Sequence, residues 1–330
     1  MRVHNNILEL VGRTPLVRLR TGIRPDGPGA FAKLEFFNPT GSVKDRMVAY
    51  IVKRAIDDGR LKPGDTIIDN TSGNTGVSMG MVASLTGLKA IAVAPEKTSK
   101  EKVDLIRSYG VKVIITPTKA NHDDPDSFYM VARRLALENG YFDLDQYDNQ
   151  DNVESHYLTT GPEIWDDTDG RITHFISGIG TGGCFSGIAR FLKEKNPDIQ
   201  AIAVDPEGSV FADYIKNKRV VEASLYKVEG IGSDVITKAL HPQLVDKVIT
   251  VSDEASFNRA RLITRNEGIS GGGSSGSVAV AMEQIAGDLG PEALIVGIFA
   301  DAGIRYLSKC YNDQWMQKHG FLQPAKEGQQ

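Results

Sequence analysis

The sequence predicts an α/β protein with two domains, each built around a mostly parallel sheet. Short runs rich in β-branched residues alternate with segments of helical length, which is the rhythm of parallel strands joined by right-handed crossovers. The strand runs are apolar throughout, which indicates burial on both faces. The alternation restarts after the polar stretch 143–152. Two successive α/β units place the default ligand site in the cleft between them.

The first unit runs from a helix expected at 45–57 to a helix expected at 126–139. Its strands are the β-branched runs 66–69, 90–94 and 111–115. The two helices between these strands are expected at 76–85 and 99–109. Ser99 would cap the second of them, with Lys102 to Arg107 on its exposed side.

The second unit repeats the pattern. A helix at 183–195, closed by Asn196 and Pro197, follows its first strand, and a later apolar helix begins at Val278. Its strands are expected at 173–176, 201–204, 247–251 and 293–299.

Composition excludes several classes of protein. The 330 residues are 41% hydrophobic and 24% charged with a net charge of −4, so neither nucleic acid nor a membrane is an expected partner. No apolar run is long enough to span a bilayer. Two cysteines and no signal peptide indicate a cytoplasmic protein. The histidines and cysteines lack metal-ligand spacing, so no metal site is expected.

Lys44 is the first candidate for chemistry. It lies between a turn containing Pro39 and Gly41 and the helix expected from Asp45. The positive field of a helix start and partial burial both disfavour an ammonium, so its pKa should be lowered. A neutral lysine can form a Schiff base with an aldehyde. The alternative is an ordinary solvated lysine.

Two loops between strands and helices are candidates for binding anions. The segment 71–76 offers hydroxyl, amide and backbone donors without a cation, which suits a carboxylate, although a capped helix start is an equal alternative. The glycine-rich segment 177–183 suits a phosphate. It also fits the dinucleotide pattern G-x-G-x-x-G weakly, with Asp205 as the acid that would bind a ribose.

A fourth segment, 271–277, combines a glycine run with serines before the apolar helix. A flat ligand could lie against its backbone, with Ser274 bonded to a ring nitrogen, whereas composition alone favours a flexible turn. A reactive amine, a carboxylate loop, a phosphate loop and this platform are together the parts that hold pyridoxal phosphate and an amino acid.

These motifs resemble those of the fold-type II pyridoxal-phosphate enzymes, in the cysteine synthase and cystathionine beta-synthase family. The resemblance covers residues 6–322. It implies two three-layer αβα domains like those of the tryptophan synthase beta chain. The segments that favour the cystathionine beta-synthase side are 205–209, 228–232 and 312–322.

The resemblance assigns roles by position. Lys44 would carry the cofactor and transfer protons, Asn74 would bond the phenolic oxygen, and Ser274 would face the ring nitrogen. The phosphate would be held by Gly180, Thr181, Gly182, Gly183 and Cys184. The first substrate would be bound by Thr71, Ser72, Gly73, Thr75 and Gln146. The second substrate would pass Gly230 and Ser233.

The chain departs from the family pattern at several positions. Cys184 replaces a threonine of the phosphate loop, so a hydroxyl contact is lost or replaced by a weak S–H donor. Ser233 replaces a tyrosine and Gly271 a bulkier residue, which widens or repolarises the substrate side. The segment 300–303, Ala-Asp-Ala-Gly, replaces Pro-Asp-Ser or Pro-Asp-Gly.

The resemblance implies β-replacement on L-serine or O-acetyl-L-serine with a thiol, forming cystathionine or cysteine. The alternatives are another nucleophile in a specialised biosynthesis, an NAD-dependent dehydrogenase, or a non-catalytic relative. A mobile smaller domain is expected at 42–148, against a larger cofactor-binding domain formed by 1–41 and 149–330. A homodimer is expected, and haem is not, because no haem-binding extension precedes Asn6.

Overall fold

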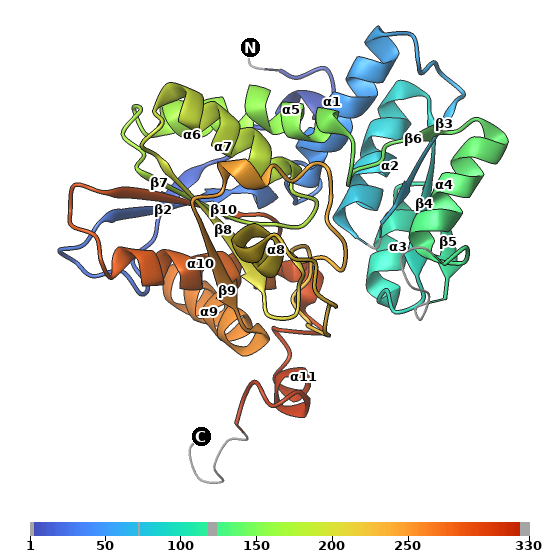
Figure 1. The fold of residues 1–330 in the computed structure, drawn as a ribbon. Coiled ribbons are helices and arrows are strands. Elements are labelled where there is room, and N and C mark those ends of the chain that lie inside the picture. The colour runs from blue at the N-terminus through green and yellow to red at the C-terminus, as the bar shows by residue number, and fades with distance from the viewer. Residues whose placement is uncertain (1–2, 72, 118–123, 324–330) are drawn as a thin grey trace.

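The computed structural model describes residues 3–71, 73–117 and 124–323, and it contains two sheets that lie in separate halves of the molecule (Figure 1). Nine of the ten described strands are paired in parallel, and only the edge strand β1 is antiparallel to its neighbour. Helices cover both faces of each sheet, so the predicted α/β class is confirmed.

The larger sheet has the strand order β1-β2-β10-β7-β8-β9. Helices α6 (Thr160–Asp167) and α7 (Gly183–Lys195) pack on one face, while α9 (Asp253–Glu267) and α10 (Gly273–Ala286) pack on the other. The strands are β1 (Leu16–Arg18), β2 (Gly29–Leu34), β7 (His174–Gly178), β8 (Gln200–Pro206), β9 (Lys247–Val251) and β10 (Leu294–Phe299).

The smaller sheet has the strand order β5-β4-β3-β6. Ile67 and Ile68 of β3 face opposite sides and join two separate cores, because side chains alternate along a strand. The strands are β3 (Thr66–Asn70), β4 (Lys89–Pro95), β5 (Lys112–Thr116) and β6 (Phe142–Asp143). The helices are α1 (Lys44–Asp57), α2 (Asn74–Thr86), α3 (Lys100–Ser108) and α4 (Phe128–Asn139).

The remaining elements were not anticipated from the sequence. Helix α5 (Gln150–Leu158) packs against both α1 and α7 and so lies between the two halves. The short helices are α8 (Phe211–Asn217) and α11 (Asp313–Lys318), with 3₁₀ turns at Ile7–Leu10, Glu35–Phe37, Pro242–Leu244 and Gly303–Tyr306.

The start of α10 corrects one expectation. The helix begins at Gly273 and not at Val278, so Ser274 lies in its first turn. The small residues there serve helix packing: a Cβ at Gly276 would lie 1.9 Å from the carbonyl oxygen of Ser256 in α9. Glycine and serine therefore mark a close helix contact at this position, whereas composition favoured a turn.

Backbone pairing joins three segments that are distant in the sequence. Ser42 forms a bridge with Asp301, and Gly271 forms one with Ala302. The N–H of Val43 also donates to the carbonyl oxygen of Ala300 over 2.8 Å. The loop before Lys44, the end of β10 and the start of α10 are thereby held together.

Candidate active site

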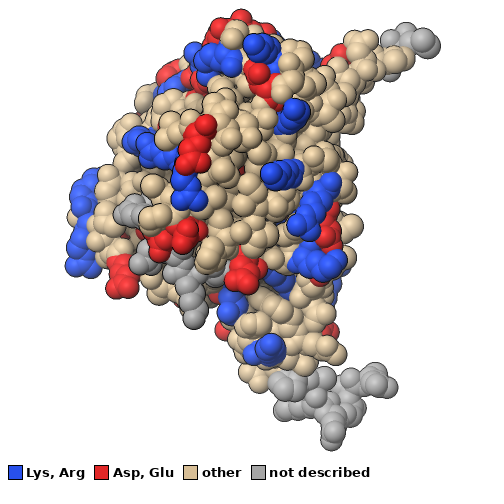
Figure 2. Space-filling view, turned by 90° about the vertical axis from the view of Figure 1, so that its right-hand side faces the viewer, with Lys and Arg blue, Asp and Glu red and all other residues tan. Residues whose placement is uncertain are grey.

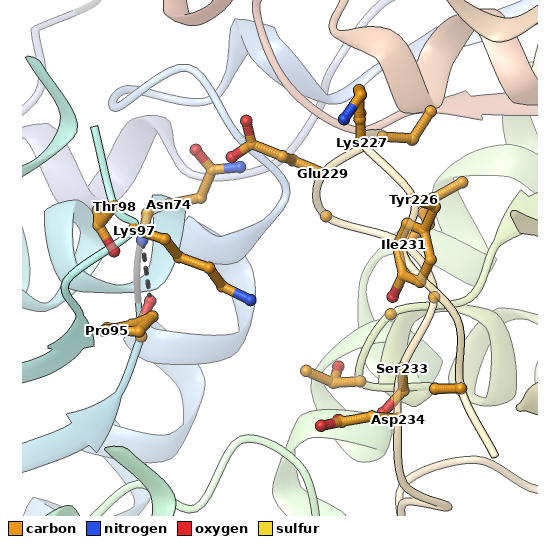
Figure 3. A pocket seen from close by; sticks show the side chains of 18 of the residues that line it. Asn74, Pro95, Lys97, Thr98, Tyr226, Lys227, Glu229, Ile231, Ser233 and Asp234 are labelled. Atoms are coloured by element: carbon orange, nitrogen blue, oxygen red, sulfur yellow. Dashed lines mark hydrogen bonds between the residues drawn. The ribbon is translucent and has the colours of Figure 1, made fainter. Parts of the chain in front are cut away.

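A cavity of about 1030 Å³ lies between the two halves of the molecule (Figure 3). Among the residues singled out from the sequence, those on its wall are Lys44, Thr71, Gly73, Asn74, Thr75, Gln146, Gly180, Thr181, Gly230 and Ser233. Gly182, Gly183, Cys184 and Ser274 do not line it and lie in or beside the first turns of α7 and α10. Ser72 lies outside the described residues.

Lys44 is the first residue of α1 and is partly buried. Burial lowers the pKa of its ammonium, because the charged form loses hydration; Cys184, Asp69 and Asp301 oppose this effect and do not cancel it. The direction agrees with the expectation from the sequence. A lysine in this state loses its proton more readily than a solvated one.

A buried ion-pair network fixes the start of α1 against the larger sheet. The Arg46 guanidinium donates from Nε to Glu35 Oε2 over 2.7 Å and from Nη1 to Glu163 Oε1 over 2.7 Å. Lys33 of β2 pairs with Glu163 over 3.0 Å. Burial by itself would raise the pKa of Glu163, but Arg46 and Lys33 lower it to about 2. The position of Lys44 is therefore set by α6 and β2 as well as by its own helix.

The loop between β7 and α7 is packed so tightly that only glycine fits at several positions. A Cβ at Gly180 would lie 2.4 Å from the Gly230 carbonyl oxygen, and one at Gly183 would lie 2.2 Å from Asn152 Oδ1. Gly182 has φ +93° and would meet the Leu240 nitrogen at 2.5 Å. Such a loop leaves backbone N–H groups at the start of α7 for a phosphate.

Cys184 behaves as a packing residue. It lies against the apolar cluster between α7 and the larger sheet. Burial raises the pKa of its thiol to about 12, so the thiol stays protonated and is a poor nucleophile.

The 71–76 segment and Gln146 meet on one side of the cavity. Thr75 donates its hydroxyl to Gln146 Oε1 over 2.8 Å, and Gln146 Nε2 donates to the Asn70 carbonyl oxygen over 3.0 Å. Asn152 Nδ2 donates both to the Gln146 carbonyl oxygen over 2.7 Å and to Thr181 Oγ1 over 3.0 Å. This side chain ties the expected carboxylate loop to the expected phosphate loop.

Asp301 is a buried carboxylate directly behind the cavity wall. Its Oδ2 accepts from Asn74 Nδ2 over 2.7 Å and from the Tyr306 hydroxyl over 2.6 Å. The Gly272 N–H donates to its carbonyl oxygen over 3.0 Å. Burial raises the pKa of Asp301, although the bonds from Tyr306 and Asn74 oppose the shift. Its position at the carboxyl end of β10 is a signal that could have identified it.

The segment 226–234 forms the wall that faces Asn74 and Lys97 across the cavity. Figure 3 shows Lys97 extending from the smaller half toward the wall that carries Tyr226, Ile231 and Ser233. Glu229 pairs with both Lys102 of α3 and Lys309. Burial would raise the pKa of Glu229, but the two lysines lower it.

The ion pair corrects the expectation for Lys102. Its side chain is only 11% exposed and not on a solvated helix face. Its Nζ also lies 5.0 Å from the centre of the Tyr306 ring. The helical pattern misplaced it because the other half of the molecule covers that face of α3.

The structure removes the basis for a dinucleotide site. Asp205, the acid that would bind a ribose, is fully buried at the end of β8. Its Oδ2 accepts the N–H of Ala212 over 2.8 Å, next to the start of α8. This carboxylate caps its own loop and does not reach the cavity wall.

Comparison with known proteins identifies the family. The profile described as "Pyridoxal-phosphate dependent enzyme" matches residues 7–301. The chain belongs to this family. The cystathionine beta-synthases of Apis mellifera and Mus musculus are each 43% identical to it, over 98% and 96% of the chain. The chain spans 64% and 57% of their respective lengths.

The solved structure of O-ureido-L-serine synthase superimposes with a TM-score of 0.87 at 31% identity, over 99% of this chain and 98% of that one. The family, its pyridoxal-phosphate cofactor and the fold inferred from the sequence motifs are thus confirmed. The individual residue roles stay predictions.

The residues present fit pyridoxal phosphate. The 180–183 loop is a cradle that a Cβ would fill, and Lys44 has a lowered pKa. Ser274 is a buried residue in the first turn of α10. Phosphate, aldehyde and ring nitrogen would each find a matching group.

Other classes of site find little support in the described ranges. These residues contain no group of three or more potential metal ligands. No described helix is both long and apolar enough to cross a bilayer. Figure 2 shows basic and acidic side chains interspersed over one face of the molecule.

Proposed function

We propose that the chain catalyses β-replacement on L-serine or O-acetyl-L-serine with a thiol nucleophile. If the nucleophile is homocysteine, the product would be cystathionine; if it is sulfide, the product would be cysteine. The observation that carries the proposal is the gathering of Lys44, the 71–76 segment and the 180–183 loop around one cavity. The names of the curated relatives support the same reaction.

Bound pyridoxal phosphate supplies an electron-accepting ring that stabilises negative charge at the substrate α-carbon. Gly180 to Gly183 would hold the phosphate through backbone N–H groups at the start of α7. Ser274 would face the ring nitrogen, and Asn74 the phenolic oxygen. Lys44 would attach the cofactor through Nζ and, once released, accept the α-proton at the same atom.

The substrate carboxylate would be bound by Thr71, Ser72 and Thr75, with Gln146 holding Thr75 in place. The 226–234 wall and the Glu229 ion pairs would restrict water while the nucleophile enters. We further propose that 42–148 moves as a unit against the remainder, because the one Glu229 ion pair that joins α3 to the other half, with Lys102, can open and reform.

A second candidate is β-replacement with a different nucleophile. Ser233 lines the cavity with a small polar side chain where a tyrosine was expected from the family pattern. The structural relative is named O-ureido-L-serine synthase, which indicates that this fold accepts other nucleophiles. A wider, more polar mouth favours an amine or hydroxyl compound over a thiol.

The test is a substrate panel. Purified protein would be incubated with serine or O-acetylserine and with homocysteine, sulfide or amines, and the products identified by mass spectrometry. Cystathionine or cysteine as the main product is expected. A main product from an amine would select the second candidate, and no product with any pair would indicate a non-catalytic relative.

We also propose a cytoplasmic homodimer. The small cysteine content supports the compartment, and the prevalence of symmetric dimers among soluble enzymes supports the assembly. Light scattering at several protein concentrations would test the assembly, and a monomeric mass throughout would refute it.

A further inference from the structure

We propose that Asp301 is a positioning residue: it holds the side-chain amide of Asn74 in one orientation and so determines which atom Asn74 presents to the cofactor. The inference rests on the function proposed above. Asp301 itself does not line the cavity, whereas Asn74 does. Any effect of this carboxylate on the reaction must therefore pass through a neighbour.

The place of Asp301 in the fold makes its side chain rigid. Its backbone forms a bridge with Ser42, two residues before Lys44, and accepts the N–H of Gly272, two residues before Ser274. Its side chain is 2% exposed in relative area. A single residue thus contacts the loop of the reactive lysine, the loop of the ring-facing serine and the amide of Asn74.

The chemistry of the bond to Asn74 determines the amide orientation. An ionised carboxylate only accepts hydrogen bonds, so the atom of Asn74 that faces it must be the nitrogen. The 2.7 Å contact from Nδ2 to Asp301 Oδ2 uses one amide hydrogen. The second amide hydrogen remains for the phenolic oxygen of the cofactor. With the amide reversed, that oxygen would meet a second acceptor.

The Tyr306 hydroxyl strengthens this arrangement. It donates over 2.6 Å to the same oxygen, Oδ2, and Oδ1 is buried with no partner among the described residues. Both donors therefore bind the same oxygen, which can accept two hydrogen bonds, and the Lys102 ammonium lies over the Tyr306 ring. A buried carboxylate with an unused oxygen is costly to keep, which argues for a role beyond packing.

The test is a double-mutant cycle on the holoenzyme with Asp301→Asn and Asn74→Ala. Because an asparagine can also donate, Asp301→Asn would no longer impose one orientation on the Asn74 amide. Each variant is expected to lower kcat about tenfold with little change in KM. Each is also expected to alter the visible absorbance of the bound cofactor. The kcat of the double variant should be no lower than that of the less active single variant, because both changes remove the same interaction.

The matched control is Asp205→Asn. Asp205 is also a buried aspartate near the carboxyl end of a strand of the same sheet, β8, and its Oδ1 is likewise without a partner in the described structure. The factors by which Asp205→Asn and Asn74→Ala lower kcat should multiply in the double variant. Asp205→Asn should leave the visible absorbance of the cofactor unchanged. If the Asp301 and Asn74 effects multiply as well, or if Asp301→Asn leaves the absorbance unchanged, the proposal is overturned.

A second variant, Tyr306→Phe, tests the proposal if Asp301→Asn does not fold. If Asp301→Asn gives no folded protein, Tyr306→Phe removes one of the two donors and keeps the carboxylate. It should alter the absorbance and show coupling with Asn74→Ala, and independence of the two would overturn the proposal. The absorbance does not depend on which nucleophile reacts, so a negative substrate panel and a negative cycle are separate results.

Discussion

The wall of the cavity that carries the 180–183 loop is held by close backbone packing, whereas the 226–234 wall is tied to α3 by a side-chain ion pair. On the first wall and directly behind it, a Cβ at Gly180 would meet the Gly230 carbonyl oxygen and one at Gly182 would meet the Leu240 nitrogen. On the second, Glu229 joins Lys102 and Lys309. The first arrangement suits a cofactor that stays in place, and the second suits a mouth that opens for substrates.

The energetics of the two walls differ for a physical reason. Packed backbone has no alternative arrangement at low cost, because interiors are as dense as organic crystals. The side chains of an ion pair can exchange their partner for water or for a charged substrate, at a cost that grows with their burial. Substitutions on the first wall should therefore reduce activity sharply, and those on the second should tune it.

The largest effect should come from Lys44→Ala. Loss of the attaching and proton-transferring amine should lower turnover by about 10³-fold or more. Trapping with borohydride and mass spectrometry would show whether the cofactor is still joined to the chain. Lys53→Ala is the control, because Lys53 is an exposed lysine of the same helix. Wild-type turnover in Lys44→Ala would refute the role.

The next effect concerns the anchoring of α1. Glu163 has a pKa of about 2 in the folded protein against an ordinary 4.5. Its contribution to the free energy of unfolding should be about 3 kcal/mol, fully present above pH 4.5 and lost as the pH falls toward 2. In Glu163→Gln this part of the acid sensitivity should disappear. Denaturant titrations at several pH values would measure it, and an unchanged pH profile would contradict the network.

A moderate effect is expected from Gly183→Ala. The added Cβ would meet Asn152 Oδ1 at 2.2 Å, which should cost about 1–3 kcal/mol in stability and weaken cofactor retention. Gly287→Ala at the end of α10 is the control, because its nearest contact would be 3.4 Å away at a helical φ of −57°. Equal melting temperatures for the two variants would show that the cradle is less rigid than its packing indicates.

The smallest effect should come from Glu229→Gln on the second wall. Loss of the charge that joins Lys102 and Lys309 should lower the free energy of unfolding, although the glutamine oxygen can still accept a hydrogen bond from a lysine. KM for the nucleophile should change more than kcat, because the wall admits the nucleophile and does not touch the reacting proton. A large loss of kcat with constant KM would place Glu229 in the chemistry and remove the contrast between the walls.

Much of the fold could be predicted because its signals are local. The strand at 66–69 and the helix at 183–195 show in the hydrophobic pattern and in the flanking Gly, Asn and Pro residues. Strands β1 and β2 were missed because they precede the alternating pattern. β1 pairs with β2, and β2 joins the sheet through β10, which lies more than 250 residues away. The start of α10 was predicted too late, at Val278, because the glycines before it indicated a turn, whereas they allow close packing against α9.

The sequence by itself determined the cofactor family, because each motif is a contiguous strand-loop-helix segment whose backbone geometry follows from its own residues. Tertiary structure alone decided which side chains meet across the cavity. Asn74 and Asp301 are 227 residues apart, and Lys102 and Glu229 are 127 residues apart. No local pattern encodes such pairs, because they depend on how two separately packed sheets are placed against each other.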